Sequence, residues 1–235
     1  MVDTRRIATM AVLGAAALGL AALVQRPAWA AWGGDRPVKA PPAQFVLPDP
    51  ASGREIAIFS GGCFWGMQGV FQHVRGVSQV ISGYAGGRAV TAHYETVSSG
   101  LTRHAETVKI VFDPRQVRYV DLLRVYFSVA TDPTQLNRQF PDEGTQYRGE
   151  IFYLDAAQEA EAQHYIAQLQ AAHLYTDRIV TRLDPFTGFY PAESYHQDFL
   201  IKHPDSPYIS TYDLPKIAAL RVLLPDLYRA APAAG

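Results

Sequence analysis

The chain has 235 residues, 48% of them hydrophobic and 18% charged, with a formal net charge of −1 at pH 7. This length allows one or two domains with a substantial core, and the apolar content excludes a disordered protein. The balanced charge argues against general nucleic-acid binding, and the single cysteine excludes a disulfide within the chain and a zinc site built from several cysteines.

The first 30 residues have the pattern of an export signal. Two arginines precede a small or apolar stretch over residues 7–24, and the sequence Ala-Trp-Ala at 28–30 supplies a cleavage site. We therefore expect residues 1–30 to be a signal peptide and the protein to be periplasmic or otherwise extracytoplasmic. An uncleaved membrane anchor is the alternative, because about 18 apolar residues are just enough to span a bilayer.

The next segment, residues 31–53, is rich in proline and glycine and predicts a linker or an extended arm. A short apolar run over residues 55–59 predicts a buried strand, which two glycines end. Apolar residues then recur at helical spacing from Phe64 to Val74. Cys63 therefore belongs to the first turn of a helix that follows a glycine turn.

The remaining elements alternate irregularly along the chain. Strands are predicted over residues 77–84, 106–112, 151–154 and 179–183. Helices are predicted over residues 119–130, 155–173, 193–202 and 214–224, and the stretch 131–146 predicts a long polar loop. Such a mixture predicts an α+β fold, with helices packed on a mixed sheet.

Cys63 is the first candidate for chemistry. A buried structural thiol is the ordinary role of a lone cysteine. Here the two preceding glycines leave the thiol uncrowded, and a helix N-terminus offers free N–H groups and a positive dipole end that favour the thiolate. The position predicts a nucleophile.

Glu106 is the second candidate, because it shares a strand face with Val108, Ile110 and Phe112. A carboxyl group that faces the core has its ionised form disfavoured and its pKa raised, as a general acid requires. The alternative is a solvated carboxylate at the start of the strand. His104, two residues earlier, is expected to be exposed.

Three other features of the sequence bear on function. The polar loop 131–146 groups hydrogen-bonding residues, which is typical of functional loops, although a solvated connection is the ordinary case. The seven histidines are scattered, and the glycine-rich stretch 83–87 lacks the phosphate-loop pattern. Neither a metal nor a nucleotide is expected.

Seven short motifs occur in order along the chain: Gly61-Gly62-Cys63-Phe64-Trp65-Gly66, Gly83-Tyr84-Ala85-Gly86-Gly87, His104-Ala105-Glu106, Asp132-Pro133-Thr134, Asn137-Arg138-Gln139, Asp142-Glu143-Gly144-Thr145-Gln146-Tyr147-Arg148 and Tyr195-His196-Gln197. The ordered set resembles the A-type peptide methionine sulfoxide reductases, which reduce the S epimer of methionine sulfoxide in the repair of oxidised proteins. The resemblance extends from about residue 55 to residue 228.

The resemblance implies a fold and an apolar substrate pocket. The family fold is a mixed sheet flanked by helices, related to the ferredoxin-like plait. It would occupy residues 54–205, with a C-terminal tail at 206–235. Cys63 would attack the sulfoxide sulfur, while Phe64 and Trp65 would form the pocket for the S-methyl group.

The resemblance also implies a polar side of the site. Glu106 would protonate the sulfoxide oxygen, because this oxygen leaves poorly until it is protonated. Tyr94 and Tyr147 would hydrogen-bond the same oxygen. Asp142 would help to place the substrate through water.

The chain departs from the family pattern at three places. Arg103 stands where glycine is usual, and Phe140-Pro141 replaces a more common Gly-Asn before Asp142. The third departure is the absence from the tail 206–235 of the resolving cysteines that many members carry there.

The single cysteine predicts how the enzyme is regenerated. Attack on the sulfoxide would leave Cys63 as a sulfenic acid, which an external thiol must then reduce. This reductant would be a thioredoxin-like protein or a small thiol. We expect a monomer without a bound cofactor, a metal or a nucleic-acid partner.

Two other functions stay open on the residues alone. One is a one-cysteine thiol peroxidase, which would also use a reactive thiolate. The other is a non-catalytic peptide-binding relative that keeps the fold.

Overall fold

The computed structural model describes residues 37–48 and 53–235. The expected signal peptide, residues 1–30, lies outside the described residues. Within the described part of the chain, no helix combines the length and the apolar character that a membrane span requires.

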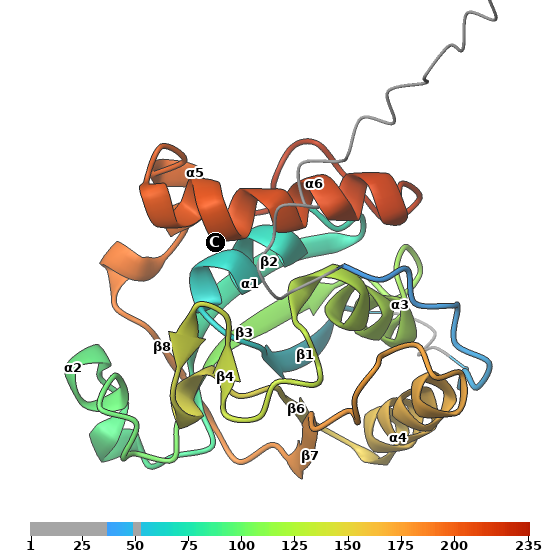
Figure 1. Cartoon of the computed structure of the whole chain (residues 1–235), viewed down its shortest axis with the longest axis horizontal. Coiled ribbons are helices and arrows are strands. Elements are labelled where there is room, and N and C mark those ends of the chain that lie inside the picture. Colours follow the sequence, from blue (N-terminus) through green and yellow to red (C-terminus); the bar gives the residue numbers. More distant parts are fainter. Residues whose placement is uncertain (1–36, 49–52) are drawn as a thin grey trace, which may run out of the picture.

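Six strands form one mixed sheet in the middle of the molecule (Figure 1). In the order in which they lie side by side they are β7 (Arg182–Pro185), β6 (Glu150–Tyr153), β1 (Glu55–Ser60), β3 (Ala105–Phe112), β2 (Val77–Ala85) and β8 (Phe189–Pro191). Only the β6–β7 pair of this sheet is parallel, and the other four pairs are antiparallel. The predicted α+β fold with a mixed sheet flanked by helices is confirmed.

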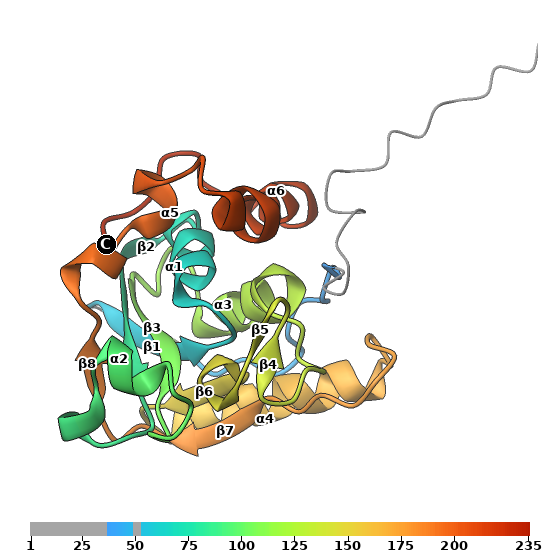
Figure 2. The ribbon, with the colours of Figure 1, turned by 60° about the vertical axis from the view of Figure 1, so that its left-hand side comes forward.

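The helices lie around this sheet. They are α1 (Phe64–Gln72), α2 (Tyr94–Val97), α3 (Tyr119–Val125), α4 (Ala156–Ala171), α5 (Phe199–Lys202) and α6 (Leu214–Leu223). Five-residue π-helical turns, η3 (Tyr126–Ala130) and η6 (Ile209–Asp213), follow α3 and precede α6. Figure 2 shows α6 against α1, so the C-terminal segment packs on the helix that follows Cys63.

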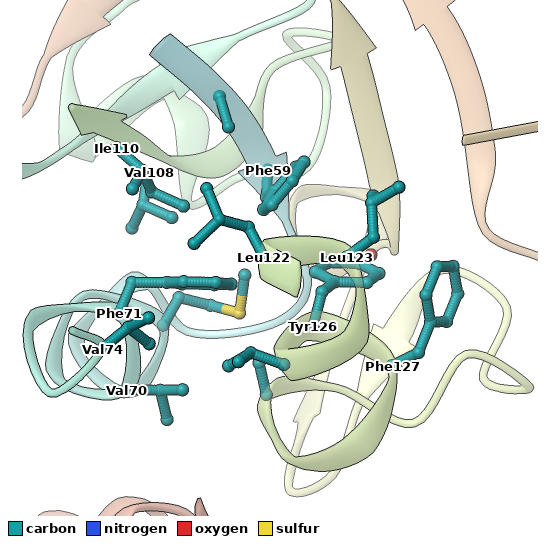
Figure 3. Packing of buried hydrophobic residues seen from close by; sticks show 14 of the residues in the cluster. Phe59, Val70, Phe71, Val74, Val108, Ile110, Leu122, Leu123, Tyr126 and Phe127 are labelled. Carbon is teal, nitrogen blue, oxygen red and sulfur yellow. The ribbon is translucent and has the colours of Figure 1, made fainter. Parts of the chain in front are cut away.

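The main core lies between one face of the sheet and the helices. Phe59 of β1 packs its ring 5.6 Å from that of Phe71 of α1 and 5.4 Å from that of Tyr126, which follows α3 (Figure 3). Alternate residues of a strand point to opposite faces of a sheet. In β3 this alternation places Val108 and Ile110 in the main core, on the same face as Glu106.

The strand and helix predictions from local patterns are confirmed for most elements. The N-cap of α4 is one case, since the Asp155 side chain accepts a hydrogen bond from the Gln158 N–H at 2.9 Å. The predicted strand 179–183 begins later, at Arg182. The predicted helix 119–130 ends in a π-helical turn, in which the Thr131 N–H reaches the Tyr126 carbonyl at 3.2 Å.

The predicted helix over residues 193–202 is wrong. It is divided into a 3₁₀ turn, η5 (Ser194–His196), and the short helix α5. The backbone of Asp198 between them has a φ of 58°, in the left-handed region that a continuous right-handed helix excludes. Strand β8, just before this segment, was not predicted.

Two segments that were expected to be irregular are more ordered than the sequence indicated. The polar loop 131–146 contains a small hairpin of β4 (Arg138–Gln139) and β5 (Asp142–Glu143), followed by the 3₁₀ turn η4 (Thr145–Tyr147). Residues 37–48 form no helix or strand but lie against α4 and the end of α3. The Tyr165 hydroxyl, for example, donates to the Pro41 carbonyl at 2.7 Å.

Candidate active site

The sheet register brings Cys63 and Glu106 together from distant parts of the chain. Phe59 pairs with Val108 in the β1–β3 ladder, and the next two residues are joined through their hydroxyls, with Ser60 Oγ 2.7 Å from Thr107 Oγ1. The chain therefore leaves β1 opposite Glu106. It turns through two glycines and enters α1 over the face of the sheet to which the Glu106 side chain points.

The glycine turn is required by close packing as well as by its backbone. Gly62 has a φ of +99°, and a Cβ added there would lie 2.6 Å from Cγ of Gln139. Four residues on, a Cβ at Gly66 would lie 2.1 Å from Oδ1 of Asp213. Larger residues at either position would displace the turn and the first turn of α1, and with them Cys63.

Cys63 is the residue directly before α1 and is half-buried. The pKa of its thiol is raised well above the usual value, first by burial and then by the carboxyl groups of Glu106 and Asp213. The Trp65 backbone N–H lowers it, as expected at a helix N-terminus, but it is outweighed. The expectation that this position favours the thiolate is therefore wrong for the substrate-free protein.

Glu106 is buried, at 3% exposure, as its strand face predicted. Its Oε2 accepts a hydrogen bond from the Phe64 backbone N–H at 2.9 Å. Burial raises its pKa from the usual 4.5 to about 8, and this hydrogen bond offsets only part of the effect. The predicted raised pKa is confirmed, and the alternative of a solvated carboxylate is wrong.

Tyr94, in α2, and Tyr147, in η4, both lie near Glu106, and both are half-buried. The pKa of each hydroxyl is raised by burial first and next by the charge of Glu106. Tyr94 is held by its backbone N–H, which donates to Glu193 at 2.9 Å. The structure thus gathers two phenol groups, the Glu106 carboxyl and the Cys63 thiol around one point.

Aromatic rings gather at the start of α1, directly after Cys63. Phe64 is buried, and its ring lies 4.9 Å from that of His196. Trp65 is half-buried and stacks on Phe199, with ring centroids 3.8 Å apart and an interplanar angle of 11°. Both members of the predicted apolar pocket therefore lie beside the thiol, with Trp65 the more accessible of the two.

His196 positions Trp65, a role that was not predicted. The Trp65 indole N–H donates to His196 Nδ1 at 3.1 Å, so the neutral imidazole carries its proton on Nε2. Burial lowers the pKa of His196, which keeps the ring neutral, and no residue in the described part of the chain hydrogen-bonds to its Nε2. The only signal in the sequence was its place in the Tyr195-His196-Gln197 motif.

Asp142 lies at the start of β5 and accepts a hydrogen bond from the Tyr208 hydroxyl. Burial raises the pKa of Asp142, while this hydrogen bond and Lys216 lower it. The Tyr208 ring also meets Trp65 edge-on, with ring centroids 5.9 Å apart. Tyr208, which no sequence pattern singled out, therefore closes the site from the C-terminal segment.

Asp213 is a further acidic group beside α1 that was not predicted. It is buried, and within residues 37–48 and 53–235 neither carboxylate oxygen has a hydrogen-bond partner, although Lys216 Nζ lies 4.0 Å from Oδ1. Burial raises its pKa to about 7. Glu106, Asp213 and Asp142 each add to the effect of burial in raising the pKa of the Cys63 thiol.

His104 is buried, at 1% exposure, so its expected exposure is wrong. Its Nε2 lies 3.0 Å from the Arg88 carbonyl oxygen, and a Cβ at Gly87 would lie 2.4 Å from the His104 ring. Arg103 beside it has a φ of 65°, the backbone conformation that glycine adopts most readily. The positive φ explains why glycine is usual at this position.

Among the described residues, no group of three or more His, Cys, Asp or Glu side chains is arranged to hold a metal ion.

The sequence model of the family described as Peptide methionine sulfoxide reductase matches residues 55–222. The chain belongs to this family. It is 58% identical over 182 residues to a Mesorhizobium japonicum protein named Peptide methionine sulfoxide reductase MsrA 2, covering 77% of this chain and 93% of that protein. A Synechocystis protein of the same name is 46% identical over 199 residues, covering 80% of this chain and 93% of that protein.

Solved structures of the family have the same fold. Mxr1 from Saccharomyces cerevisiae in reduced form superposes with a TM-score of 0.62 and 28% identity, covering 72% of this chain and 96% of that chain. Methionine sulfoxide reductase A of Corynebacterium diphtheriae gives a TM-score of 0.55 and 34% identity, covering 73% and 87%. The predicted family and activity are confirmed: this reductase is an oxidoreductase that reduces methionine sulfoxide and repairs oxidised proteins.

Proposed function

We propose that this reductase acts on the S epimer of methionine sulfoxide, free or in proteins, with Cys63 as the nucleophile and Glu106 as the acid. The observation that carries this proposal is the state of Glu106. Its carboxyl group is buried next to the N–H of the residue that follows the thiol, and its pKa of about 8 leaves it protonated at neutral pH. A sulfoxide oxygen requires such a donor before it can leave sulfur.

The first step moves one oxygen atom from the substrate to the enzyme. Sγ of Cys63 attacks the sulfoxide sulfur while Glu106 protonates the sulfoxide oxygen. This attack forms a bond between Sγ and the substrate sulfur. The hydroxyl group then passes to Sγ as the sulfur–oxygen bond of the substrate and this sulfur–sulfur bond both break. The substrate sulfur is reduced to the thioether, Cys63 is oxidised to the sulfenic acid, and the thiol proton returns to Glu106. Proton and electron numbers therefore balance without a cofactor.

The two sides of the site account for epimer choice. Trp65 and Phe64 offer an apolar wall to the methyl group, and Tyr94, Tyr147 and Glu106 offer donors to the oxygen. A sulfoxide sulfur carries a methyl group, an oxygen, a lone pair and the rest of the side chain. When the methyl group, the oxygen and the side chain are each fixed in place, the lone pair of one epimer alone faces away from Cys63.

The second step needs a thiol from outside the chain. Cys63 is the single cysteine, so an external thiol must attack the sulfenic acid and release water. A second external thiol then reduces the mixed disulfide and restores Cys63. We propose a thioredoxin-like protein or a small thiol as the donor and a monomer as the working form. Turnover measured with each donor, and light scattering after gel filtration, test these two points.

The proposal is tested by epimer-resolved turnover. Wild-type protein with excess dithiothreitol should reduce the S epimer of a methionine sulfoxide peptide and leave the R epimer unchanged. After one turnover without reductant, intact mass should rise by one oxygen atom on Cys63. Cys63→Ser should abolish both results. Reduction of hydrogen peroxide without reduction of the peptide would overturn the proposal in favour of a thiol peroxidase.

We also propose that the protein is exported. The support is the basic start, apolar stretch and cleavage pattern within residues 1–30. Fractionation of cells that express the whole chain should place it outside the cytoplasm, with an N-terminus near residue 31. A product of full length in the membrane fraction would indicate the anchor instead.

A further inference from the structure

A row of aromatic rings leads from the site to the surface. Trp65 lies beside Cys63, and the ring of Tyr208 meets it edge-on. The Tyr212 ring follows, with its centroid 5.1 Å from that of Tyr208. The Phe140 ring ends the row, 5.7 Å from Tyr212 at an interplanar angle of 79°.

The outer part of the row is built from two separate segments. Phe140 lies in the turn between β4 and β5, and Tyr208 and Tyr212 lie at the π-helical turn η6. In this turn Ile209 and Asp213, four residues apart, are buried, while the two tyrosines, also four residues apart, are half-buried. The helical repeat therefore turns both tyrosine rings to the side that Phe140 approaches.

The row is held in place but is not covered. The Tyr208 hydroxyl donates to Asp142, and the Phe140 backbone N–H donates to the Gln135 side chain at 3.0 Å. Phe140 nevertheless leaves 40% of its surface in solvent. A large apolar side chain fixed by its own backbone and left open beside a catalytic site suits contact with a substrate.

We propose that Phe140 and Tyr212 form a subsite for the residue next to the oxidised methionine, and that this subsite prefers a bulky apolar side chain. The row begins at Trp65, which the proposed function assigns to the S-methyl group, so a peptide that places its methionine sulfoxide at Cys63 can lay a neighbouring side chain along these rings. Apolar and aromatic side chains bind favourably against aromatic rings, whereas a glycine has no side chain to make this contact. This inference rests on the proposed function.

The test uses peptides that differ at one residue. Four pentapeptides carry the S epimer of methionine sulfoxide at the centre, with phenylalanine or glycine directly before or directly after it. The ratio of kcat/KM for a phenylalanine peptide to that for the matching glycine peptide measures the preference. We expect a ratio of about three- to tenfold on at least one side, the range of one aromatic contact.

Variants locate the preference. Phe140→Ala and Tyr212→Ser should each bring the ratio to about one, and Phe140→Tyr should retain it. Val222→Ala, which truncates an apolar residue of α6 that is 63% exposed, is the matched control and should leave the ratio unchanged. Because the two test variants lie on different segments, misfolding of one leaves the other informative.

The outcomes separate this inference from the proposed function. A wild-type ratio near one on both sides, or an unchanged ratio in both test variants, overturns the subsite while turnover of methyl p-tolyl sulfoxide still supports the reductase. If Phe140→Ala lowers turnover with a protein reductant but leaves the peptide ratio unchanged, the row serves the reductant and the subsite is wrong. Absence of any sulfoxide turnover by the wild type overturns the proposed function itself.

Discussion

Glu106→Gln is the substitution that tests the catalytic proposal most directly. Glutamine has nearly the same shape and keeps a carbonyl oxygen that can accept from the Phe64 backbone N–H, the hydrogen bond that Glu106 makes at 2.9 Å. Its amide group cannot transfer a proton as the protonated carboxyl group of Glu106 can. The substitution therefore removes the acid and preserves the packing at the start of α1.

The expected loss follows from the protonation of Glu106. With a pKa of about 8, the carboxyl group is roughly nine-tenths protonated at pH 7. General-acid catalysis by a positioned side chain is worth about 10²- to 10⁴-fold in rate. We expect the rate of sulfenic acid formation at pH 7 to fall by this factor in the variant.

The assay is single-turnover formation of the thioether product, measured by rapid quench from pH 6 to pH 10. Each rate is first divided by the fraction of Cys63 thiolate measured in the same protein, because the charge of Glu106 also raises the pKa of Cys63. The ratio of the wild-type value to the variant value then isolates Glu106 as the acid. This ratio should fall roughly tenfold between pH 7 and pH 9, as Glu106 loses its proton. An unchanged rate at pH 7, or a ratio independent of pH, would refute the assignment of Glu106 as the acid.

The same substitution should stabilise the fold. The pKa of Glu106 is raised on folding, so its contribution to stability is present at low pH and is lost as the pH rises from about 4.5 to about 8. At pH 7 the ionisation of Glu106 lowers the free energy of unfolding by about 3 kcal/mol. Glutamine does not lose this stability, because it has no charge to desolvate. Urea unfolding at pH 5 and pH 8 should show a larger gain for the variant at pH 8. An equal gain at both pH values would contradict the raised pKa.

Three other substitutions or treatments test the site. Alkylation of Cys63 by iodoacetamide at pH 7.5 should be more than about tenfold slower than that of an unstructured cysteine peptide, because the thiol pKa is raised; a faster reaction would show a thiolate. Tyr208→Phe should raise KM for methionine sulfoxide by about tenfold by freeing Asp142, and a KM equal to that of the wild type would leave the hydrogen bond without a role. Gly66→Ala should lower the free energy of unfolding by about 1–3 kcal/mol or more, since its Cβ would lie 2.1 Å from a buried carboxylate oxygen; unchanged thermal stability would refute that contact.

Local patterns predicted the parts of the fold whose periods are regular. The alternation of β3 fixed which of its residues face the core, and it placed Glu106 among them before any contact was known. The spacing of apolar residues after Cys63 predicted α1, and the Asp155 cap predicted the start of α4. These features depend on neighbours in the sequence, which is why the sequence alone was sufficient.

The predictions that were wrong concern residues whose structure depends on contacts with distant parts of the sequence. His104 is polar and lies at a strand end, yet Tyr84 and Tyr190 cover it, with ring centroids 6.2 Å and 5.7 Å away. Asp198 breaks the helix expected over residues 193–202, and its backbone N–H is held by the Gln68 side chain of α1 at 2.8 Å. No window along the chain contains both partners of these contacts. The packing between segments therefore overrode the local pattern.

Cys63 depends on neighbours of both kinds: its position is set by the local sequence and its pKa by residues that are distant in the sequence. Its place before α1 follows from the sequence, but its raised pKa comes first from burial and then from Glu106, Asp213 and Asp142, which lie on three other segments. A thiol that stays protonated without substrate reacts slowly with general oxidants. In a chain with one cysteine this matters, because no internal disulfide can protect an oxidised Cys63 from further oxidation. Burial and the carboxyl groups thus keep the thiol protonated, and in the proposed mechanism Cys63 reacts only when a sulfoxide lies between it and Glu106.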